Sequence, residues 1–429
     1  MPYDEMEELR AARRELDLVV EEVQRVPGFE TFLAPPTVRE VGTAAQDRPL
    51  VYLSASEAAG TGLLVRGERI EHVPLPALTA HALRLRTEAY LTAHRADKRH
   101  GTADWRAVLD DITGWLWDAV MGPVLDRMTD DTAATLVAGG LLGLLPLHAA
   151  WTPDTARPTG RRYALDHLVL AYTPNARALS TARELAAMRP VERLVTVADP
   201  PRSPAGSRLG YARSETLAAE AAFPGGSEFV GGPGADARTV TAALHGADVV
   251  HLACHGKVDL VEPLNSHLLL AGTDQLTLRD LLTVRLRLRL RLAVLSACET
   301  SVPGGRLPDE VVSLPTGLLQ AGVAGVLASL WEVTDVATAM LMTEFYRRWR
   351  HTDGVTSPSE ALAGAQVWLR DTTNSEKLRC YEDAERQRAA WLPTQSGQGF
   401  RLALHMSGAP TERSYAHPDL WAGFAHVGA

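Results

Sequence analysis

The sequence predicts an α/β protein in which helices cover both faces of a mostly parallel sheet. From residue 165 onward, short apolar runs alternate with stretches of helical period, a pattern typical of parallel sheets. Two of these runs, 247–253 and 292–297, are rich in Val and Leu and are too short to be buried helices. We therefore expect two buried parallel strands at these positions.

Length and composition indicate a globular protein of more than one unit. The chain has 429 residues, of which 46% are hydrophobic and 22% are charged, and domains usually hold ~100–200 residues. We expect an N-terminal helix and linker at 1–36, a smaller α+β unit at 37–160, and the parallel α/β domain at 161–429. No run reaches the ~20 apolar residues of a membrane helix, and the acidic N-terminal stretch differs from a secretory signal. A cytoplasmic protein without membrane association is therefore expected.

Charge and cysteine content argue against two further classes of protein. The formal net charge of −9 disfavours a nucleic-acid binder. The three cysteines, Cys254, Cys298 and Cys380, are too few for a disulfide framework in a chain of this length. One alternating stretch, RLRLRLRL at 285–292, predicts a strand with an Arg face. That face is either a basic groove for an acidic partner or a solvated edge that discourages strand pairing.

The first 160 residues predict helices and a few strands. Residues 4–26 have a helical apolar period that Pro27-Gly28 ends. After it we expect a strand at 49–54, a hairpin at 61–75 that turns at 66–68, helices near 77–97 and 104–128, and a strand at 134–138. The histidines of this part are scattered and suit packing or solvated roles.

The remaining sequence predicts the alternating strands and helices of the main sheet. Strands are expected near 167–172, 192–198, 247–253, 292–297 and 324–330. Helices are expected near 175–188, 214–222, 236–245, 277–283, 309–321, 334–350 and 359–371. Residues 372–400 are polar and look inserted, with a helix at 375–390 and a flexible tail.

The two buried strands each lead to a chemically active side chain. The first is followed by His255 and Gly256, and the second by Cys298. Chemistry in open parallel sheets collects outside the carboxyl ends of the strands, so the imidazole and the thiol are expected side by side. His255 would remove the thiol proton, and the thiolate of Cys298 would attack a carbonyl. The N–H groups of Gly256 and Cys298 would bind the oxyanion. Both side chains also have a structural interpretation, as a hydrogen-bonded core histidine and a buried cysteine.

The neighbours of His255 suit packing better than chemistry. Strand alternation turns Cys254 to the opposite face, where it is expected in the core, and puts His251 on the same face as His255 as buried packing. Together with Cys298 these residues could be read as a metal site. Tetrahedral zinc usually draws on paired ligands such as CxxC or HxxxH in turns. The sequence has no CxxC, and its HxxxH spacing, His251 and His255, falls on a predicted strand, so we expect no metal.

Eight ordered stretches resemble those of the CHAT domain family, the bacterial branch of the caspase- and separase-like cysteine peptidases. They are LPLHAAW (145–151), AYTPNARAL (171–179), HLACHG (251–256), LSACET (295–300), LLQAGVAGVLASLWEVTD (318–335), LMTEFYRRW (341–349), ALAGAQ (361–366) and HPDLWAGF (417–424). One departure follows the cysteine, where Ser301 takes the place of the family's usual glycine. It puts the conformation of that loop in question but not the pair of His255 and Cys298.

The resemblance implies a fold, an activity and partners. It implies a caspase-like α/β/α sandwich at 161–429, and at 37–160 a non-catalytic unit of the kind that is often a degenerate copy of the peptidase. It implies a cysteine endopeptidase without metal or cofactor that cleaves a protein substrate, sometimes a gasdermin-like pore former encoded beside it in anti-phage defence. Residues 26–36 resemble a segment upstream of CHAT domains in longer repeat proteins, so a regulatory repeat or sensor protein is a further expected partner. The alternative is a signalling scaffold that acts by protein–protein contact without turnover.

Three acidic residues follow predicted strands at positions that would wall the primary substrate pocket. Asp199 ends the strand at 192–198, and Glu332 and Asp335 follow the strand at 324–330. A buried carboxylate needs a cationic partner, so we expect cleavage after Arg or Lys, with Asp199 the stronger choice. In the alternative interpretation Asp335 caps the helix at 336–350, with Thr334 as a neighbouring cap, and Asp199 turns the chain before Pro200-Pro201.

Overall fold

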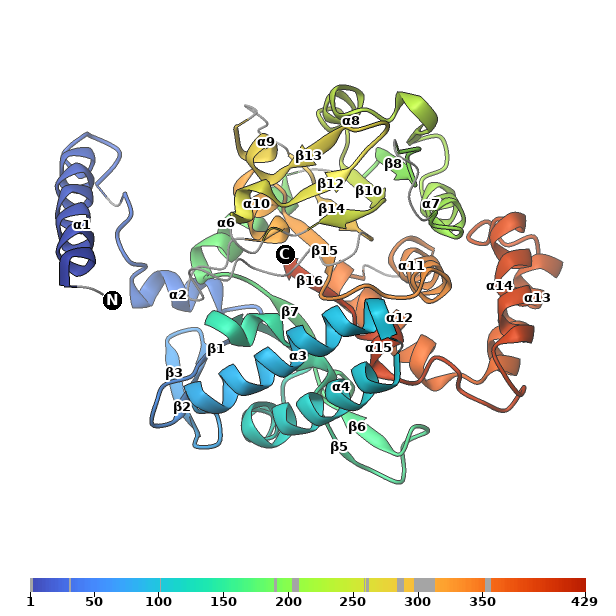
Figure 1. The fold of residues 1–429 in the computed structure, drawn as a ribbon, viewed down its shortest axis with the longest axis horizontal. Coiled ribbons are helices and arrows are strands. Elements are labelled where there is room, and N and C mark those ends of the chain that lie inside the picture. Colours follow the sequence, from blue (N-terminus) through green and yellow to red (C-terminus); the bar gives the residue numbers. More distant parts are fainter. Residues whose placement is uncertain are drawn as a thin grey trace.

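Figure 1 shows the fold of the protein as a ribbon, in a computed structural model. The structure describes residues 3–30, 32–100, 102–188, 191–202, 208–257, 259, 262–283, 289–296, 313–351 and 356–429. For residues 3–10, 95–100, 102–103, 263 and 283 it describes the main chain alone.

A single large sheet runs through the described part of the protein. This 11-stranded sheet has the spatial order β3 (Arg69–Leu75), β2 (Gly60–Arg66), β1 (Leu50–Ser54), β4 (Ala133–Ala138), β7 (Val169–Tyr172), β16 (Phe424–Gly428), β15 (Gly325–Ser329), β14 (Leu292–Leu295), β10 (Val249–Ala253), β8 (Leu194–Ala198) and β9 (Ser227–Val230). Strands β9, β8, β10, β14 and β15 pair in parallel, whereas β16 is antiparallel to β15, and β3, β2 and β1 pair antiparallel. The predicted α/β class with a mostly parallel sheet is confirmed.

The strands expected after residue 165 are confirmed as β7, β8, β10, β14 and β15. Strands β10 and β14 are fully buried and lie side by side, with Leu252 opposite Leu295. Residues buried on both faces must be apolar throughout, and this explains the continuous Val and Leu runs. The two short antiparallel sheets at the surface are β11 (Gly256–Lys257), β12 (His267–Leu269) and β13 (Gln275–Thr277), and β5 (Trp151–Pro153) and β6 (Arg161–Tyr163).

The helices of the C-terminal part lie close to their expected positions. They are α6 (Ala176–Ala187), α7 (Ala212–Ala221), α8 (Ala237–Leu244), α9 (Leu278–Thr283), α10 (Leu314–Gln320), α11 (Asp335–Arg350) and α12 (Pro358–Asp371). The short helix α15 (Pro418–Trp421) was not expected. Residues 309–312 of the expected helix at 309–321 lie outside the described residues. Several helices start at a side-chain cap, such as Asn175 before α6 and Ser357 before α12. Such caps accept main-chain N–H groups that have no partner inside the helix.

The expected flexible tail within 372–400 is wrong, because a second helix forms there. Helix α13 (Asn374–Arg386) is followed by α14 (Thr394–Met406), and Figure 1 shows the two packed together at one side of the molecule. Phe400 and Leu404, one helical turn apart, are buried. The hydroxyl of Ser396 donates to the carbonyl of Ser214 on α7 at 2.9 Å. Two apolar anchors and one contact with α7 therefore order a segment whose composition is mostly polar.

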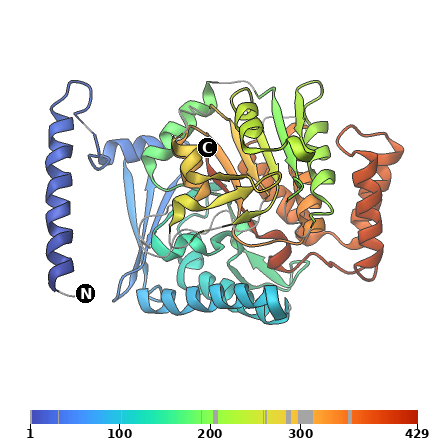
Figure 2. The ribbon, with the colours of Figure 1, turned by 45° about the horizontal axis from the view of Figure 1, so that its top comes forward.

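Most of the N-terminal elements follow the sequence prediction, but helix α2 (Val38–Ala44) was not expected, and a π-helical turn divides the helix predicted at 104–128. The N-terminal elements are α1 (Tyr3–Gln24), α2, the strands β1 to β4, α3 (Ala80–His100), α4 (Thr102–Leu116), and α5 (Gly122–Leu125) after the π-helical turn. Figure 2 shows α1 standing away from the rest of the chain, whereas α3 and α4 lie against it in Figure 1.

The two sides of the boundary predicted at residue 160 contribute to the same sheet. Strands from both sides of it pair directly, because β4 and β7 are parallel neighbours. The ring of Trp105 on α4 meets that of Trp331, which follows β15, at a centroid distance of 5.8 Å. Both indoles are buried, so the N-terminal unit contributes to one continuous core. The division into two units stays a prediction.

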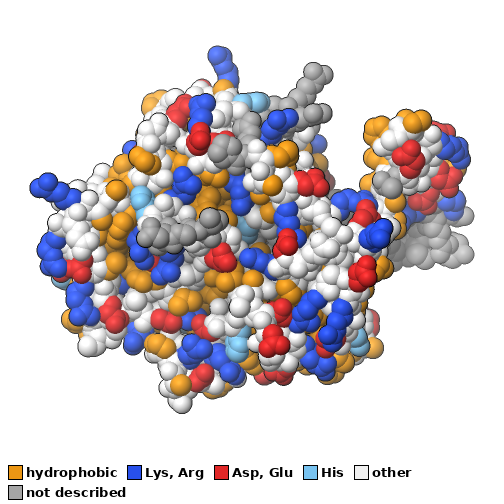
Figure 3. Space-filling model, turned by 180° about the vertical axis from the view of Figure 1, so that it is seen from behind, with side chains coloured by type: hydrophobic (Ala, Val, Ile, Leu, Met, Phe, Trp, Pro, Cys, Tyr) orange, Lys and Arg blue, Asp and Glu red, His pale blue; other side chains and the backbone are white. Residues whose placement is uncertain are grey.

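The RLRLRLRL stretch is described in part. Residues 284–288 lie outside the described residues, and β14 begins at Leu292. Leu290 is buried and forms a bridge with Val323, and Arg289 is exposed. On the face shown in Figure 3, the described basic and acidic side chains are interspersed. Among the described helices, none is both long and apolar enough to span a membrane.

Candidate functional site

His255 lies directly beyond the carboxyl end of β10. The chain bends at Cys254, and the carbonyl of His255 accepts the N–H of Leu269 in β12 at 2.8 Å. Gly256 then opens the small surface sheet by pairing with Leu268. The side chain of His255 is partly exposed. The main chain on either side of His255 therefore belongs to two different sheets, and this fixes the position of its Cα atom.

Cys298 lies outside the described residues, which end at Ser296 and resume at Ser313. The strand before it, β14, is among the described residues. Strand β14 is parallel to β10, so both chains leave the sheet at the same edge. Ser296, two residues before Cys298, lies within 3.2 Å of the His251 ring, measured from its hydroxyl to Nε2.

A pocket of about 460 Å³ opens at this edge between β10, β14 and the starts of α7 and α11. Its volume is in the range of small-ligand sites. The lining residues are His94, Leu209, Ala212, Glu215, Ala253, Ser296, Glu332, Val333, Thr334, Asp335 and Thr338. Three of them are carboxylic acids, so a cationic group fits the pocket better than an anionic one.

Asp335 and Glu332 form part of the wall of this pocket. Asp335 is the first residue of α11, and its carboxylate accepts the N–H of Tyr211, before α7, at 2.8 Å. The alternative role of Asp335 as the cap of α11 is wrong, since Thr334 is at the cap position and its side chain makes no cap bond. Burial, together with the charges of Glu215 and Asp199, raises the pKa of Asp335. Glu332 is exposed at the rim.

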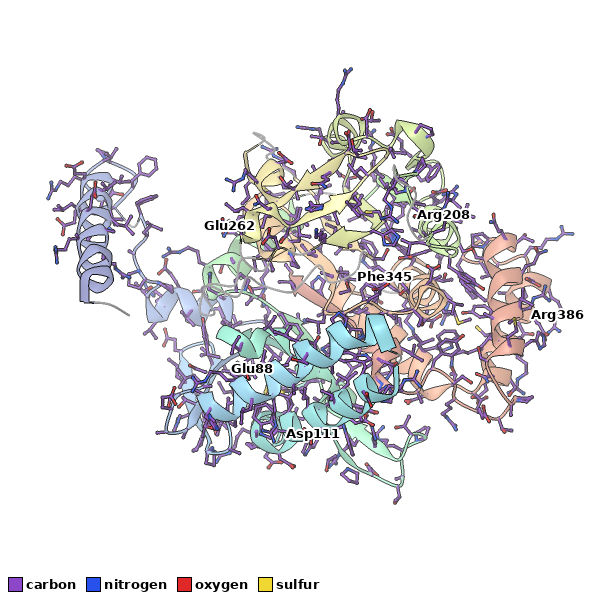
Figure 4. The ribbon with its side chains drawn as sticks, viewed as in Figure 1. Glu88, Asp111, Arg208, Glu262, Phe345 and Arg386 are labelled. Atoms are coloured by element: carbon purple, nitrogen blue, oxygen red, sulfur yellow. The ribbon has the colours of Figure 1, made fainter. Side chains whose placement is uncertain are left out.

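Asp199 follows β8 and takes a backbone conformation that few residues adopt. Its φ is +35°, in the left-handed region that Asp tolerates better than most side chains. Its N–H donates to the carbonyl of Ala253 at 2.8 Å, which ties it to the end of β10. Its buried carboxylate lies 2.5 Å from Nε of Arg208, a side chain exposed to 77%. Figure 4 shows Arg208 beside α7.

A buried polar cluster supports the pocket from beneath. Nε2 of His251 lies 2.7 Å from the carboxylate of Glu215, and Nδ1 lies 3.0 Å from the hydroxyl of Tyr346 on α11. His251 and Tyr346 also stack, with ring centroids 5.6 Å apart. Burial, and next to it the charge of Glu215, raises the pKa of Tyr346 well above its usual value. The cluster joins β10, α7, α11 and Ser296 after β14, so it fixes the elements that surround the pocket.

Two of these supporting residues could not be found from the sequence. Glu215 reads as an ordinary helical carboxylate, and Tyr346 as part of an apolar stripe, until the fold brings them to His251. The one available signal was the histidine itself, which a fully buried strand can hold only with polar partners. Cys254 is fully buried in the core, in line with its alternation. Among the described residues, no group of three His, Cys, Asp or Glu side chains could hold a metal ion.

The family model of the CHAT domain matches residues 110–429. The chain belongs to the CHAT domain family. The match begins inside α4, so it includes part of the unit predicted as separate. No curated protein matches the chain.

Solved structures of separase share the fold. In two crystal structures of the Saccharomyces cerevisiae separase–securin complex, the similarity covers 91% of this chain at 10% identity and a TM-score of 0.55, and 77% at 9% identity and 0.52. This chain spans about a third of the length of the matched chains, 31% and 29%. Porphyromonas gingivalis RgpB, in a complex of its pro- and mature domains, matches over 80% of this chain and 76% of its own, at 11% identity and a TM-score of 0.36. The two separase structures confirm the predicted caspase-like fold.

Proposed function

We propose that the chain is a cysteine endopeptidase that uses His255 and Cys298 as a dyad. The observation that supports the proposal is the parallel pairing of β10 with β14. The ends of these strands, Ala253 and Leu295, precede His255 and Cys298 by two and three residues and lie at one sheet edge, beside a pocket of about 460 Å³. The CHAT family and the caspase-like fold support the same activity. The scaffold alternative needs neither the dyad nor a pocket.

In the proposed reaction, His255 takes the proton of the Cys298 thiol, and the thiolate attacks the scissile carbonyl. The N–H groups of Cys298 and Gly256 hold the oxyanion. His255 then gives the proton to the leaving amine, and a thioester remains between Cys298 and the substrate's acyl part. Water, deprotonated by His255, hydrolyses this thioester and restores the enzyme.

We further propose that a basic side chain before the scissile bond enters the acidic pocket. Burial and the charges of Glu215 and Asp199 raise the pKa of Asp335, and among the described residues no Arg, Lys or His side chain forms a salt bridge with its carboxylate. An Arg or Lys side chain of the substrate would supply a counter-ion. Asp335 suits this role better than Asp199, whose carboxylate Arg208 already contacts.

Covalent labelling tests the dyad directly. A peptidyl electrophile should label Cys298 in the wild type, and the rate should fall by about 10²-fold or more in His255→Ala, because the thiol then loses its base. Cys298→Ala should abolish labelling and peptide cleavage with little change in melting temperature. Cys254→Ala is the matched control and should keep most activity. Labelling that His255→Ala leaves unchanged, with no cleavage in the wild type, would instead indicate the scaffold.

A further inference from the structure

A second cavity, of about 490 Å³, lies at the other end of β14 from the acidic pocket. Arg291 directly precedes β14, whereas Ser296 directly follows it. Residues of this second cavity come from the segment before β1, from β4, α6 and β16, and from the start of α12. They are Asp47, Arg48, Thr135, Leu179, Arg183, Ala186, Ala187, Arg291, Ser357, Ser359, His426, Gly428 and Ala429. We call it the arginine cavity.

Three arginines line the arginine cavity and are partly withdrawn from water. Burial is the first cause of a lowered pKa for Arg48, Arg183 and Arg291 alike. Arg48 donates to the Ser359 hydroxyl at 3.1 Å, Arg183 to the carbonyl of Ala44 at 2.7 Å, and Arg291 to an oxygen of Ala429, the last residue of the sequence, at 2.8 Å. Among the described residues, no carboxylate side chain forms a salt bridge with any of the three. Guanidinium groups held in this way cost free energy that an anionic ligand would offset.

The acidic side chains near the arginine cavity act on its arginines without bonding to them. Asp47 acts on Arg183, and Glu360 acts on Arg48, but only through space. The carboxylate of Glu360 is bonded to Ser357 at the cap of α12. Arg48 also feels the positive charge of Arg183.

His426 is the second, independent sign of a ligand. This residue of β16 is 1% exposed, and neither ring nitrogen has a hydrogen-bond partner among the described residues. Buried polar groups are nearly always hydrogen-bonded, and one left without a partner costs free energy. The ring lines the arginine cavity close enough to Arg291 and Arg48 for both to lower its pKa after burial does. A neutral imidazole there can donate one N–H to a bound acceptor.

We propose that the arginine cavity binds a small phosphomonoester. Its donors come from several directions: three guanidinium groups, the His426 ring and the serine hydroxyls at the start of α12. A planar carboxylate is satisfied by a single Arg fork, whereas the three oxygens of a phosphate accept from many sides. Leu179, Ala186 and Ala187 give an apolar wall for the rest of the molecule. The site is independent of the peptidase chemistry.

Calorimetry with two matched probes tests the assignment. Phenyl phosphate and phenylacetate carry the same apolar group but differ in the anion, and inorganic phosphate tests the anion alone. Phenyl phosphate should bind saturably, at least about tenfold more tightly than phenylacetate, since each lost hydrogen bond to a charged group is worth about tenfold. Inorganic phosphate should bind more weakly at the same site.

Arginine variants locate the binding. Arg48→Gln and Arg183→Gln should each weaken phenyl phosphate by about tenfold or more. Arg177→Gln is the matched control, because Arg177 lies on the same helix as Arg183 but outside the cavity, and it should bind like the wild type. Equal loss in Arg177→Gln, equal affinity for phenylacetate, or no saturable binding by a wild type with a normal thermal melt would each overturn the proposal.

Discussion

The two ends of strand β14 carry cavities of similar size and opposite chemistry. At its carboxyl end the pocket of about 460 Å³ is walled by acidic side chains, among them Glu215 and Asp335. At its amino end the arginine cavity of about 490 Å³ is lined by three guanidinium groups. Only four residues, Leu292–Leu295, separate the two ends, a distance of about 13 Å along a strand.

The difference between the two ends lies in how each buried polar group is satisfied. At the carboxyl end, His251 has Glu215, Tyr346 and Ser296 as partners. At the amino end, His426 has none among the described residues. The first arrangement is complete without a ligand and is suited to holding a site in shape. The second is suited to being completed by one.

The largest effect on stability is expected where the carboxyl end is broken. Glu215→Ala would leave His251 buried without its closest partner and should lower the free energy of unfolding by about 3 kcal/mol, as for other buried polar groups that lose a hydrogen bond to a charged group. Chemical denaturation measures the change. Glu220→Ala on the same helix is the comparison. Glu220 is partly exposed and contacts Arg213 and the Thr196 hydroxyl, so its loss should cost less, about 1–2 kcal/mol. Equal losses of stability in the two variants would contradict a special contribution of the His251 cluster to folding stability.

The second largest effect is expected in mild acid, which should lower the stability of the fold through His426, near the amino end of β14. Burial, with Arg291 and Arg48, lowers the pKa of His426 to about 3. Because this folded value lies below the unfolded one, the unfolded chain takes up the proton first, and stability falls as the pH drops below about 6.5. Between pH 7 and 5 His426 should contribute a loss of about 2 kcal/mol.

The variant His426→Gln separates this residue from the others that titrate. Burial also lowers the pKa of His148, to about 4, so part of the acid loss should remain in the variant. Denaturation at a series of pH values should give a smaller slope between pH 7 and 5 for His426→Gln than for the wild type. An unchanged slope would contradict the buried, neutral state of His426.

The smallest effect concerns the charge of Asp335. Burial raises its folded pKa above the unfolded value, so the folded chain holds the proton more tightly, and this advantage is lost as the pH rises through the folded pKa. Asp335→Asn should therefore stabilise the protein near pH 7, by no more than about 1 kcal/mol once solvent screening is counted. At a pH below the ordinary carboxyl pKa the difference should vanish. A variant that is less stable than the wild type at pH 7 would contradict this account.

The sequence predicts the sheet better than it predicts the sites. Fully buried strands such as β10 leave a continuous apolar signal, and caps such as Ser357 mark helix starts. The helix α14 gave no such signal, because its burial depends on contacts with α7. Composition and period report the local chain, and they miss order that a distant element supplies.

Sites escape prediction for the same reason. Asp199 and Asp335 could be named because each follows a strand, but their ranking depended on Arg208 and Tyr211, which reach them across the fold. The arginine cavity gathers residues from before β1 to the end of β16. Of these residues, only Arg291 belonged to a stretch that the sequence marked as a candidate site. It lies in the RLRLRLRL stretch, which was interpreted either as a basic groove or as a solvated edge.

Cut-site mapping on a mixed peptide library by mass spectrometry tests the central claim most directly. The account predicts cleavage after Arg or Lys in the wild type, no cleavage in Cys298→Ala or His255→Ala, and a fall of about tenfold or more in kcat/KM for those peptides in Asp335→Asn. Glu332→Gln, at the exposed rim, should change kcat/KM less. Cleavage after Leu, Met or Asp that Asp335→Asn leaves unchanged would contradict the acidic pocket, and cleavage that persists in Cys298→Ala would contradict the peptidase itself.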